Sequence, residues 1–430
     1  MAQLRHNRWE LTGSDDADIA VINTCGFIES AKQESIETIL RAVELKKQGR
    51  VKKVVVAGCL SERYSAELRK EIPEVDTYIG ANNIDGIVRA LGGEYRSELL
   101  GERMLTTPSH FAWLKISEGC DRPCSFCSIP LMRGKHVSKP MERVVLEARR
   151  LAALGVRELI IIAQDSTYYG LDLYGKRVLA PLLRKIAELE GVEWIRLMYA
   201  FPSGFPSDLI DEFNGNPKLC AYLDMPVQHC SDNVLASMRR GIGSLELRRL
   251  IGTIRGRVPG IALRTTLITG YPNEGEKEFE ELLDFVGETE FDRLGVFTYS
   301  QEDGTAAFGL GDPVPPEVKE ERRNRIMERQ REISLKKNSM LVGRSVRVLI
   351  DEKSGGTALG RTVRDAPEID NVVEVRNAEN LPVGNFSEVT IVDAGEYDLF
   401  AVPAEGGKEK GTAGRARRTA APRAAGAGRR

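Results

Sequence analysis

Three cysteines lie close together in the chain, and their spacing is the feature that most directly suggests chemistry. Cys120, Cys124 and Cys127 follow a C-x3-C-x2-C pattern, directly after an apolar stretch at 111–116 that predicts a strand. Three soft thiolates on one tight loop suit an iron–sulfur cluster or zinc. A closed structural zinc site takes four protein ligands, whereas a working metal centre keeps one position open. This cysteine trio therefore predicts a metal centre with a free position for a small ligand.

Two other interpretations of the trio need to be weighed. A disulfide is disfavoured, because three clustered thiols cannot all pair. A zinc site completed by His136 remains open as the alternative to a cluster.

The composition is that of a large globular protein. The chain has 430 residues, of which 42% are hydrophobic and 29% charged, so it is long enough for about two to four domains. Its net charge of −2 gives no bulk attraction to nucleic acid. No apolar run approaches the length of a membrane span, and the first residues lack a signal-peptide core. With an odd number of cysteines, seven, we expect a cytoplasmic protein with no membrane association and no disulfide framework.

The elements that must position reactive residues begin with a strand–helix–strand pattern. Strands are predicted at 18–23 and 53–57, with an amphipathic helix at 30–48 between them. Cys25 and Cys59 follow the two strands closely. Parallel strands joined by a helix end at the same edge of a sheet, so we expect both thiols at that edge, where such sheets bind ligands. Isolated cysteines are also common in protein cores, so simple packing is the alternative.

A second block repeats a strand–helix unit six times from residue 107 onward. Because eight units complete a (β/α)8 circuit, six predict an α/β fold with an incomplete parallel TIM-like barrel. Polar residues follow most of these strands and would gather with the cysteine trio at the carboxyl mouth, where barrel enzymes keep their sites. We assign Cys220 and Cys230 to packing, and His229 to a structural role rather than catalysis. The predicted strands cover 113–117, 158–163, 194–199, 222–227, 263–269 and 294–298.

The rest of the chain changes character twice. A charged stretch at 316–338 predicts a solvated connecting helix. Residues 341–402 form short β-rich pieces that predict a small antiparallel barrel of OB-like size. With six basic and eleven acidic side chains, this barrel should repel phosphate and attract a basic protein. The Ala/Gly/Arg-rich end at 403–430 is predicted to be disordered.

Several segments together resemble the radical S-adenosylmethionine (SAM) methylthiotransferases. They are Asn-Thr-Cys-Gly-Phe-Ile-Glu-Ser at 23–30, Gly-Cys-Leu at 58–60, the cysteine trio, and Tyr-Ser-Gln-Glu-Asp-Gly-Thr at 299–305. The resemblance covers about residues 8–402. It implies a family amino-terminal domain at 1–100, a radical SAM barrel with its connecting helix at 107–338, a TRAM-like β-barrel at 339–402 and a tail at 403–430.

Within that family the chain is similar to the RimO branch, which modifies an aspartate of the decoding-centre protein of the small ribosomal subunit. Asp-Arg-Pro at 121–123, Met-Arg-Gly-Lys at 132–135 and Asp-Ala-Pro-Glu-Ile-Asp at 365–370 carry this similarity. The acidic terminal barrel agrees with it, because ribosomal proteins are basic. Two alternatives are methylthiolation of adenosine in tRNA and, from another class, a zinc-bearing ribosome-binding protein without catalysis.

The resemblance implies two 4Fe–4S clusters and SAM. The cysteine trio would hold the cluster whose fourth iron chelates SAM, which after one-electron cleavage gives the radical that removes hydrogen from the aspartate β-carbon. Cys25 and Cys59 would hold an auxiliary cluster that delivers sulfur. Gln164, Gly270 and Pro272 are candidate SAM contacts, although glycines after strands are also ordinary turns. A low-potential donor such as flavodoxin or ferredoxin would supply electrons, and we expect a monomer.

One departure from the family concerns the start of the chain. Methylthiotransferases carry a third amino-terminal cysteine on a first strand, and this sequence has no such strand. Residues 1–6 resemble the end of the helix that should follow it, before a short strand at 8–12. We therefore expect Met1 to be an internal methionine and the auxiliary cluster to be poorly held in the chain as given.

Overall fold

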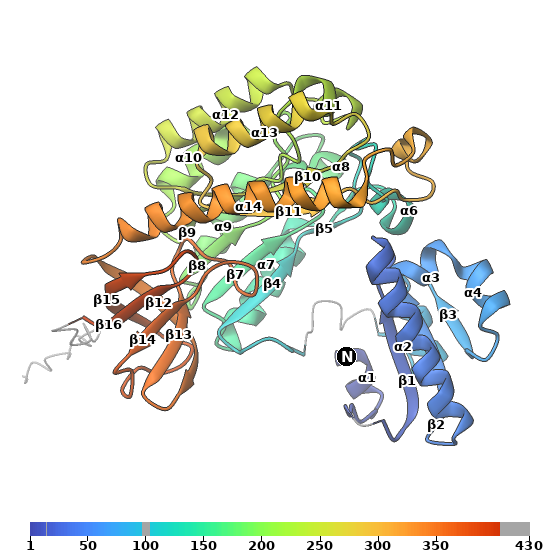
Figure 1. Cartoon of the computed structure of the whole chain (residues 1–430). Helices are drawn as coiled ribbons and strands as arrows, with labels where there is room; N and C mark the ends of the chain where they lie inside the picture. The colour runs from blue at the N-terminus through green and yellow to red at the C-terminus, as the bar shows by residue number, and fades with distance from the viewer. Residues whose placement is uncertain (14, 97–103, 405–430) are drawn as a thin grey trace, which may run out of the picture.

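Three parts make up the computed structural model, which describes residues 1–13, 15–96 and 104–404 (Figure 1). The predicted tail at 403–430 lies almost wholly outside the described residues. Within the described ranges, no helix combines the length and the apolar character needed to cross a membrane.

The amino-terminal part is a parallel sheet of order β1-β2-β3. Ile39 and Val43 of the long helix α2 are buried against Val54 and Val56 of β2, which explains why this helix has an apolar face. The predicted strand at 8–12 is wrong: Arg8 has a φ of 65°, and the chain turns back instead of extending. The elements are α1 (Ala2–His6), β1 (Ala17–Thr24), α2 (Glu29–Lys47), β2 (Val51–Gly58), α3 (Cys59–Arg63), α4 (Ser65–Glu71), β3 (Thr77–Ile79) and α5 (Ile84–Ala90).

The central part contains the six predicted parallel strands in one sheet of order β11-β10-β9-β8-β7-β4. Helices cover its outer face, and side chains such as Leu159 and Ile161 of β7 pack under them. The sheet remains open, as six strands predict. Its strands are β4 (Phe111–Lys115), β7 (Glu158–Ile162), β8 (Trp194–Leu197), β9 (Leu219–Asp224), β10 (Ala262–Thr269) and β11 (Arg293–Thr298). Its helices are α6 (Ile129–Arg133), α7 (Met141–Ala153), η2 (Ser166–Tyr168), α8 (Leu171–Tyr174), α9 (Leu179–Ala187), α10 (Ser207–Gly215), α11 (Asp232–Ser237), α12 (Ser244–Arg257), α13 (Glu276–Thr289) and η3 (Ala306–Leu310).

The charged helix α14 (Pro316–Ser339) is more than the solvated connector that the sequence predicts. Lys319 and Arg322 on it are buried, together with Ile326 and Ile333. Arg322 donates to Glu274 at 2.8 Å, so a buried carboxylate from the barrel neutralises it. The helix is not a solvated connector, because part of its charge faces inward and is paired there.

The carboxyl-terminal part is a closed five-stranded barrel of order β12-β13-β14-β16-β15. Its pairings are antiparallel except that of β14 with β16, which is parallel. A closed barrel with an odd number of strands cannot have every neighbouring pair antiparallel. In this barrel β14 and β16 form the parallel pair. The strands are β12 (Ser345–Ser354), β13 (Thr357–Arg361), β14 (Val373–Arg376), β15 (Phe386–Ala394) and β16 (Leu399–Pro403).

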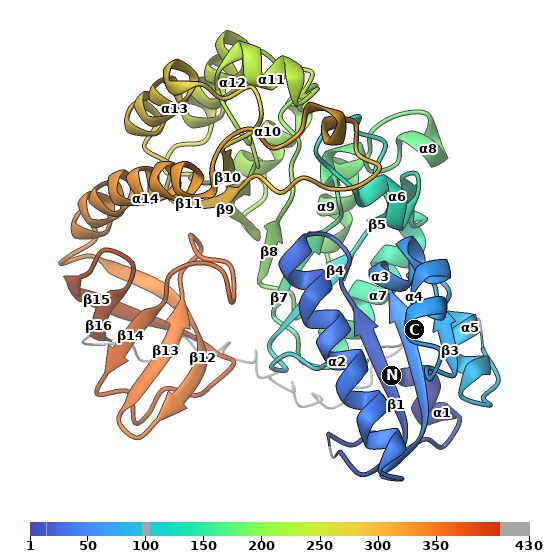
Figure 2. The same ribbon diagram turned by 45° about the vertical axis from the view of Figure 1, so that its right-hand side comes forward.

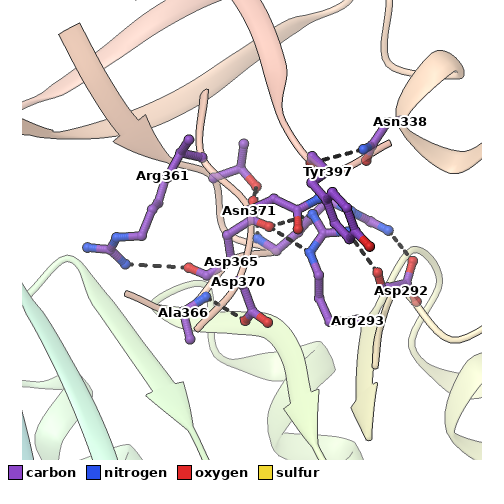
Figure 3. Close-up of polar contacts among 12 residues, drawn as sticks. Asp292, Arg293, Asn338, Arg361, Asp365, Ala366, Asp370, Asn371 and Tyr397 are labelled. Carbon is purple, nitrogen blue, oxygen red and sulfur yellow. Dashed lines mark hydrogen bonds and ion pairs between the residues drawn. The ribbon is translucent and has the colours of Figure 1, made fainter. Parts of the chain in front are cut away.

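The loop at 362–372 docks this small barrel against the central sheet (Figure 3). Arg293, the first residue of β11, donates its Nε to Asp365 at 2.9 Å, and the Tyr222 hydroxyl donates to Asp370 at 2.7 Å. The contacts lie toward the amino-terminal ends of the strands, so the carboxyl mouth stays free for chemistry.

Candidate active site

The loop that carries the cysteine trio is closed at its base by a small two-stranded sheet. β5 (Ser117–Glu118) pairs antiparallel with β6 (Val137–Ser138), so residues 119–136 form a loop between them. Gly119 begins this loop with a φ of 78°, and a Cβ there would lie 2.0 Å from the carbonyl oxygen of Lys135. Only glycine allows the two ends of the loop to approach this closely.

Burial makes two thiols of the trio, those of Cys120 and Cys127, poor ligands until a metal cluster binds. It raises the pKa of Cys120 to about 11 and that of Cys127 to about 12. Thiolates are the form that binds metals, and a coordinated cation removes the thiol proton. The thiols of this site therefore lose their protons only when a cationic group, such as a metal cluster, binds to them.

His136, the fourth ligand of the zinc alternative, has partners other than the trio. Among residues 1–13, 15–96 and 104–404, no group of three His, Cys, Asp or Glu side chains is placed to hold a single metal ion. His136 instead contacts the Ser138 hydroxyl at 3.0 Å, and its ring meets the Tyr168 ring edge-on. An iron–sulfur cluster binds each cysteine through a different iron, so it accepts thiols that are further apart.

Two arginines beside the trio, Arg122 from the same loop and Arg240 from a distant part of the chain, share one aromatic ring. Arg240, which is 4% exposed, donates its Nη1 to the sulfur of Cys124 at 3.2 Å. Arg122 donates its Nε to buried Asp165 at 2.6 Å. Their guanidinium carbons lie 4.2 and 4.0 Å from the centre of the Phe201 ring. The rim of the cysteine site is therefore cationic.

Several buried polar atoms that have no hydrogen-bond partner among the described residues lie around this mouth. Such orphan atoms are rare in proteins and point to a missing partner. Because the atoms include both donors and acceptors, they fit a small polar ligand such as SAM. They are Ser117 Oγ, Arg122 Nη2, Gln164 Oε1, Gln228 Oε1 and Arg240 Nε.

Comparison with known proteins gives matches to three families, each on a different part of the chain. The Radical SAM superfamily matches residues 114–286, the TRAM domain matches residues 342–403, and Uncharacterized protein family UPF0004 matches residues 1–80. A protein of Cytophaga hutchinsonii, named ribosomal protein uS12 methylthiotransferase RimO, is 51% identical over 93% of this chain and 92% of its own length. Its namesake in Christiangramia forsetii is 52% identical over 94% and 90%.

The chain belongs to the RimO family of methylthiotransferases. It is thus a radical SAM enzyme, whose superfamily uses an iron–sulfur cluster and SAM. The fold class predicted from the sequence is confirmed in all three parts.

The three predicted SAM contacts of this RimO-family chain differ in their surroundings. Gln164 donates its Nε2 to Glu118 at 2.9 Å and keeps its Oε1 free for a ligand. Gly270 has a φ of 73°, and the space where its Cβ would lie is taken by Lys319, so packing already accounts for this glycine. Pro272 is partly exposed. Contact of these residues with SAM stays a prediction.

The other assignments concern buried residues. Cys220 and Cys230 are buried, as the packing assignment predicts. His229 is also buried, accepts from the backbone N–H of Ser231 at 3.0 Å and lies 3.3 Å from Glu274. Among the described residues, His229 Nε2 has no hydrogen-bond partner, so its structural role stays a prediction.

Cys25 and Cys59 lie next to each other at the edge of the amino-terminal sheet. Thr24 and Gly58 are paired in register at the ends of β1 and β2, and the two cysteines are the next residues. Cys25 is exposed and Cys59 is buried at the start of α3. The expected position of this cysteine pair is therefore observed, while its role as a ligand pair stays a prediction.

Two residues around the mouth, Arg240 and Ser117, were not predicted from the sequence as site residues. Arg240 lies 116 positions from Cys124, and no motif links them. Gln228 follows a predicted strand and is one of the polar residues expected at the mouth, although its φ of 73° cannot be recognised from sequence. Only the folded central sheet brings these side chains together.

Proposed function

We propose that this chain transfers a methylthio group to the β-carbon of an aspartate in ribosomal protein uS12. The observation that carries the proposal is its identity of about one half, over more than nine tenths of its length, to proteins named for methylthiolation of uS12. The acidic composition of the terminal barrel supports a basic protein partner over an RNA, because phosphates would be repelled.

Cys120, Cys124 and Cys127 are the proposed ligands of a 4Fe–4S cluster that leaves one iron free for SAM. When bound, the cluster and SAM supply a radical that can remove hydrogen from an unactivated carbon, which no acid–base side chain can do. Arg240 offers positive charge to this anionic group. Gln164 offers a free amide oxygen to SAM.

The chain's own apolar residues hold the trio loop in place and keep water from its inner side. Phe126 packs against buried Tyr271 and Met238, and the Ser125 hydroxyl lies 2.9 Å from the Tyr271 hydroxyl. Water exclusion matters, because solvent and free thiols would consume a radical before it reached the substrate.

Cys25 and Cys59 are the proposed ligands of a second, auxiliary 4Fe–4S cluster that serves as the sulfur source. Their adjacent positions at the sheet edge support this assignment. A flavodoxin or ferredoxin is the proposed electron donor, and the enzyme is proposed to act as a monomer.

The test uses the full chain, reconstituted with iron and sulfide without oxygen and supplied with SAM and a reductant. Purified uS12 and tRNA are offered as substrates, and mass spectrometry locates any added methylthio group. We expect modification of one uS12 aspartate, at a low yield because the auxiliary cluster is expected to be poorly held, and none with Cys124→Ala. Modification of tRNA alone would reject the proposal in favour of the adenosine-modifying branch. Stoichiometric zinc in a colourless protein would favour the other alternative, a zinc-bearing ribosome-binding protein without catalysis.

A further inference from the structure

The loop that follows β11 contacts the surroundings of both groups of cysteines. At one end, the backbone N–H of Ala307 donates to the carbonyl oxygen of Ser125, inside the trio loop, at 2.7 Å. Five residues earlier, Glu302 accepts hydrogen bonds from Arg63 and Lys32 of the amino-terminal part. Figures 1 and 2 both show α3 close to α6, so the two parts meet at this point.

Glu302 is a buried carboxylate with two cations from a different part of the chain. It is 3% exposed, and its Oε2 lies 3.1 Å from Lys32 Nζ and 3.2 Å from Arg63 Nη1. The Ser300 hydroxyl donates to Oε1 at 2.8 Å, which fixes the orientation of the carboxylate. A carboxylate taken out of water is costly unless it is paired and hydrogen-bonded, so these contacts must be retained for the loop to stay in place.

Arg63 connects Glu302 to both cysteines of the pair. It is the last residue of α3, the short helix that begins with Cys59. The same Nη1 that contacts Glu302 also donates to the carbonyl oxygen of Gly26, the residue after Cys25, at 3.2 Å. Its other terminal nitrogen donates to the carbonyl oxygen of Asp303. A single guanidinium thus joins both cysteine-bearing segments to the loop.

Lys32 adds a second connection through α2, the helix that follows Cys25 along the chain. Its ammonium and the guanidinium of Arg63 both lie over the ring of Tyr64, at 5.7 and 5.0 Å from its centre. The Tyr64 hydroxyl lies 3.4 Å from Asp303. Two cations and one ring therefore enclose the acidic loop from the amino-terminal side.

We propose that Glu302, through Arg63 and Lys32, fixes the position of the Cys25–Cys59 pair relative to the cysteine trio. This inference rests on the proposed function, in which both sites must act on one substrate carbon. Glu302 is a positioning residue, since none of its contacts is to a cysteine of either site. Misplacing reacting groups by about 1 Å can cost about 100-fold in rate, so a loose connection would impair the step that needs both sites.

The experiment compares two products in Glu302→Gln, using the reconstituted full chain with uS12. One is 5′-deoxyadenosine, which reports SAM cleavage at the trio, and the other is methylthiolated uS12. We expect the amount of deoxyadenosine to stay within about twofold of that made by the parent. The amount of methylthiolated uS12 should fall about tenfold or more. This is less than the loss of about 100-fold for a full misplacement, because Gln keeps the size and shape of the Glu302 side chain. Glu321→Gln, an exposed site on α14, is the matched control and should change neither. An unchanged ratio of the two products would overturn the proposal.

A second measurement needs no cofactor and tests the positioning role of Glu302 separately from the proposed function. Hydrogen exchange of the full apo chain should be faster in Glu302→Gln for segments 26–32, 59–64 and 300–305, with the core of β7 unchanged. Arg63→Gln should give the same pattern, and the double variant should add little, because both changes break one contact. Unchanged exchange in both single variants would also overturn the connection. Absence of product in the parent chain would count against the proposed function only, and exchange would still decide the role of Glu302.

Discussion

Arg240 and Cys124 meet at the barrel mouth with 3.2 Å between nitrogen and sulfur, although 116 positions separate them in sequence. Arg240 also donates to the Pro226 carbonyl oxygen and stacks on Phe201. Among the described residues, its recorded partners include no carboxylate, so a buried cation is left for the thiolates of a cluster to neutralise.

Replacing Arg240 should change the redox behaviour of the trio cluster. Hydrogen bonds to sulfur and nearby positive charge favour the reduced cluster. We expect Arg240→Gln to shift the midpoint potential to more negative values. The measurement is a redox titration followed by electron paramagnetic resonance, in a Cys25→Ala/Cys59→Ala background that retains only the trio cluster.

The control for this prediction is Arg239→Gln, which removes the same charge from the exposed neighbouring position. It should leave the potential almost unchanged, because solvent screens exposed charges. Equal potentials for the Arg240 variant and the parent, at equal iron content, would contradict the prediction.

Gly119→Ala should damage the trio loop more than the same change at Gly134. Both glycines have positive φ, 78° and 72°, so alanine costs about 1–3 kcal/mol of backbone strain at each. At Gly119 the new Cβ would also meet the Lys135 carbonyl oxygen at 2.0 Å, whereas nothing lies within 4 Å at Gly134. We expect a larger loss of bound iron and of thermal stability in the Gly119 variant. Equal losses would show that the close approach at Gly119 is unimportant.

A buried ion-pair network should make the joint between the central and terminal barrels sensitive to acid. Glu158, fully buried, lies 2.8 Å from Arg196 and 2.7 Å from Arg361. Burial would raise the pKa of Glu158, but the two arginines outweigh it and hold the pKa below its ordinary value of 4.5. The stabilisation is present above that value and is lost as pH falls through the lower, folded-state pKa.

Glu158→Gln tests this network at neutral pH. It leaves two buried guanidiniums with an uncharged partner, and breaking such a network costs about 3–5 kcal/mol. We expect a lower midpoint of thermal unfolding than in the parent. Below pH 4.5, the free energy of unfolding of the variant should fall less steeply with pH than that of the parent. The same acid dependence in parent and variant would assign the sensitivity to other carboxylates.

Features that depend on a local sequence pattern could be predicted, whereas features that depend on tertiary contacts could not. The trio spacing and the six strands could be predicted, because thiol spacing and hydrophobic periodicity are local. The buried side of α14 could not, since the partner of Arg322 is Glu274, 48 positions away. Glu302 and Arg63 are 239 positions apart, and their contact exists only when the two parts of the chain are folded against each other.

The docking of the terminal barrel gives the last prediction. Asp365 accepts from Arg293 and from the Thr362 hydroxyl and is buried, whereas Glu368 in the same loop is exposed. Asp365→Asn weakens a charge-assisted contact that holds the loop to β11, so the barrel should detach more often. Limited proteolysis should then cut near 340–345 faster than in the parent, while Glu368→Gln should be cut at the parental rate. Because docking lies away from the mouth, the Asp365 variant should still cleave SAM, and loss of that reaction would show that the two ends of the sheet are coupled.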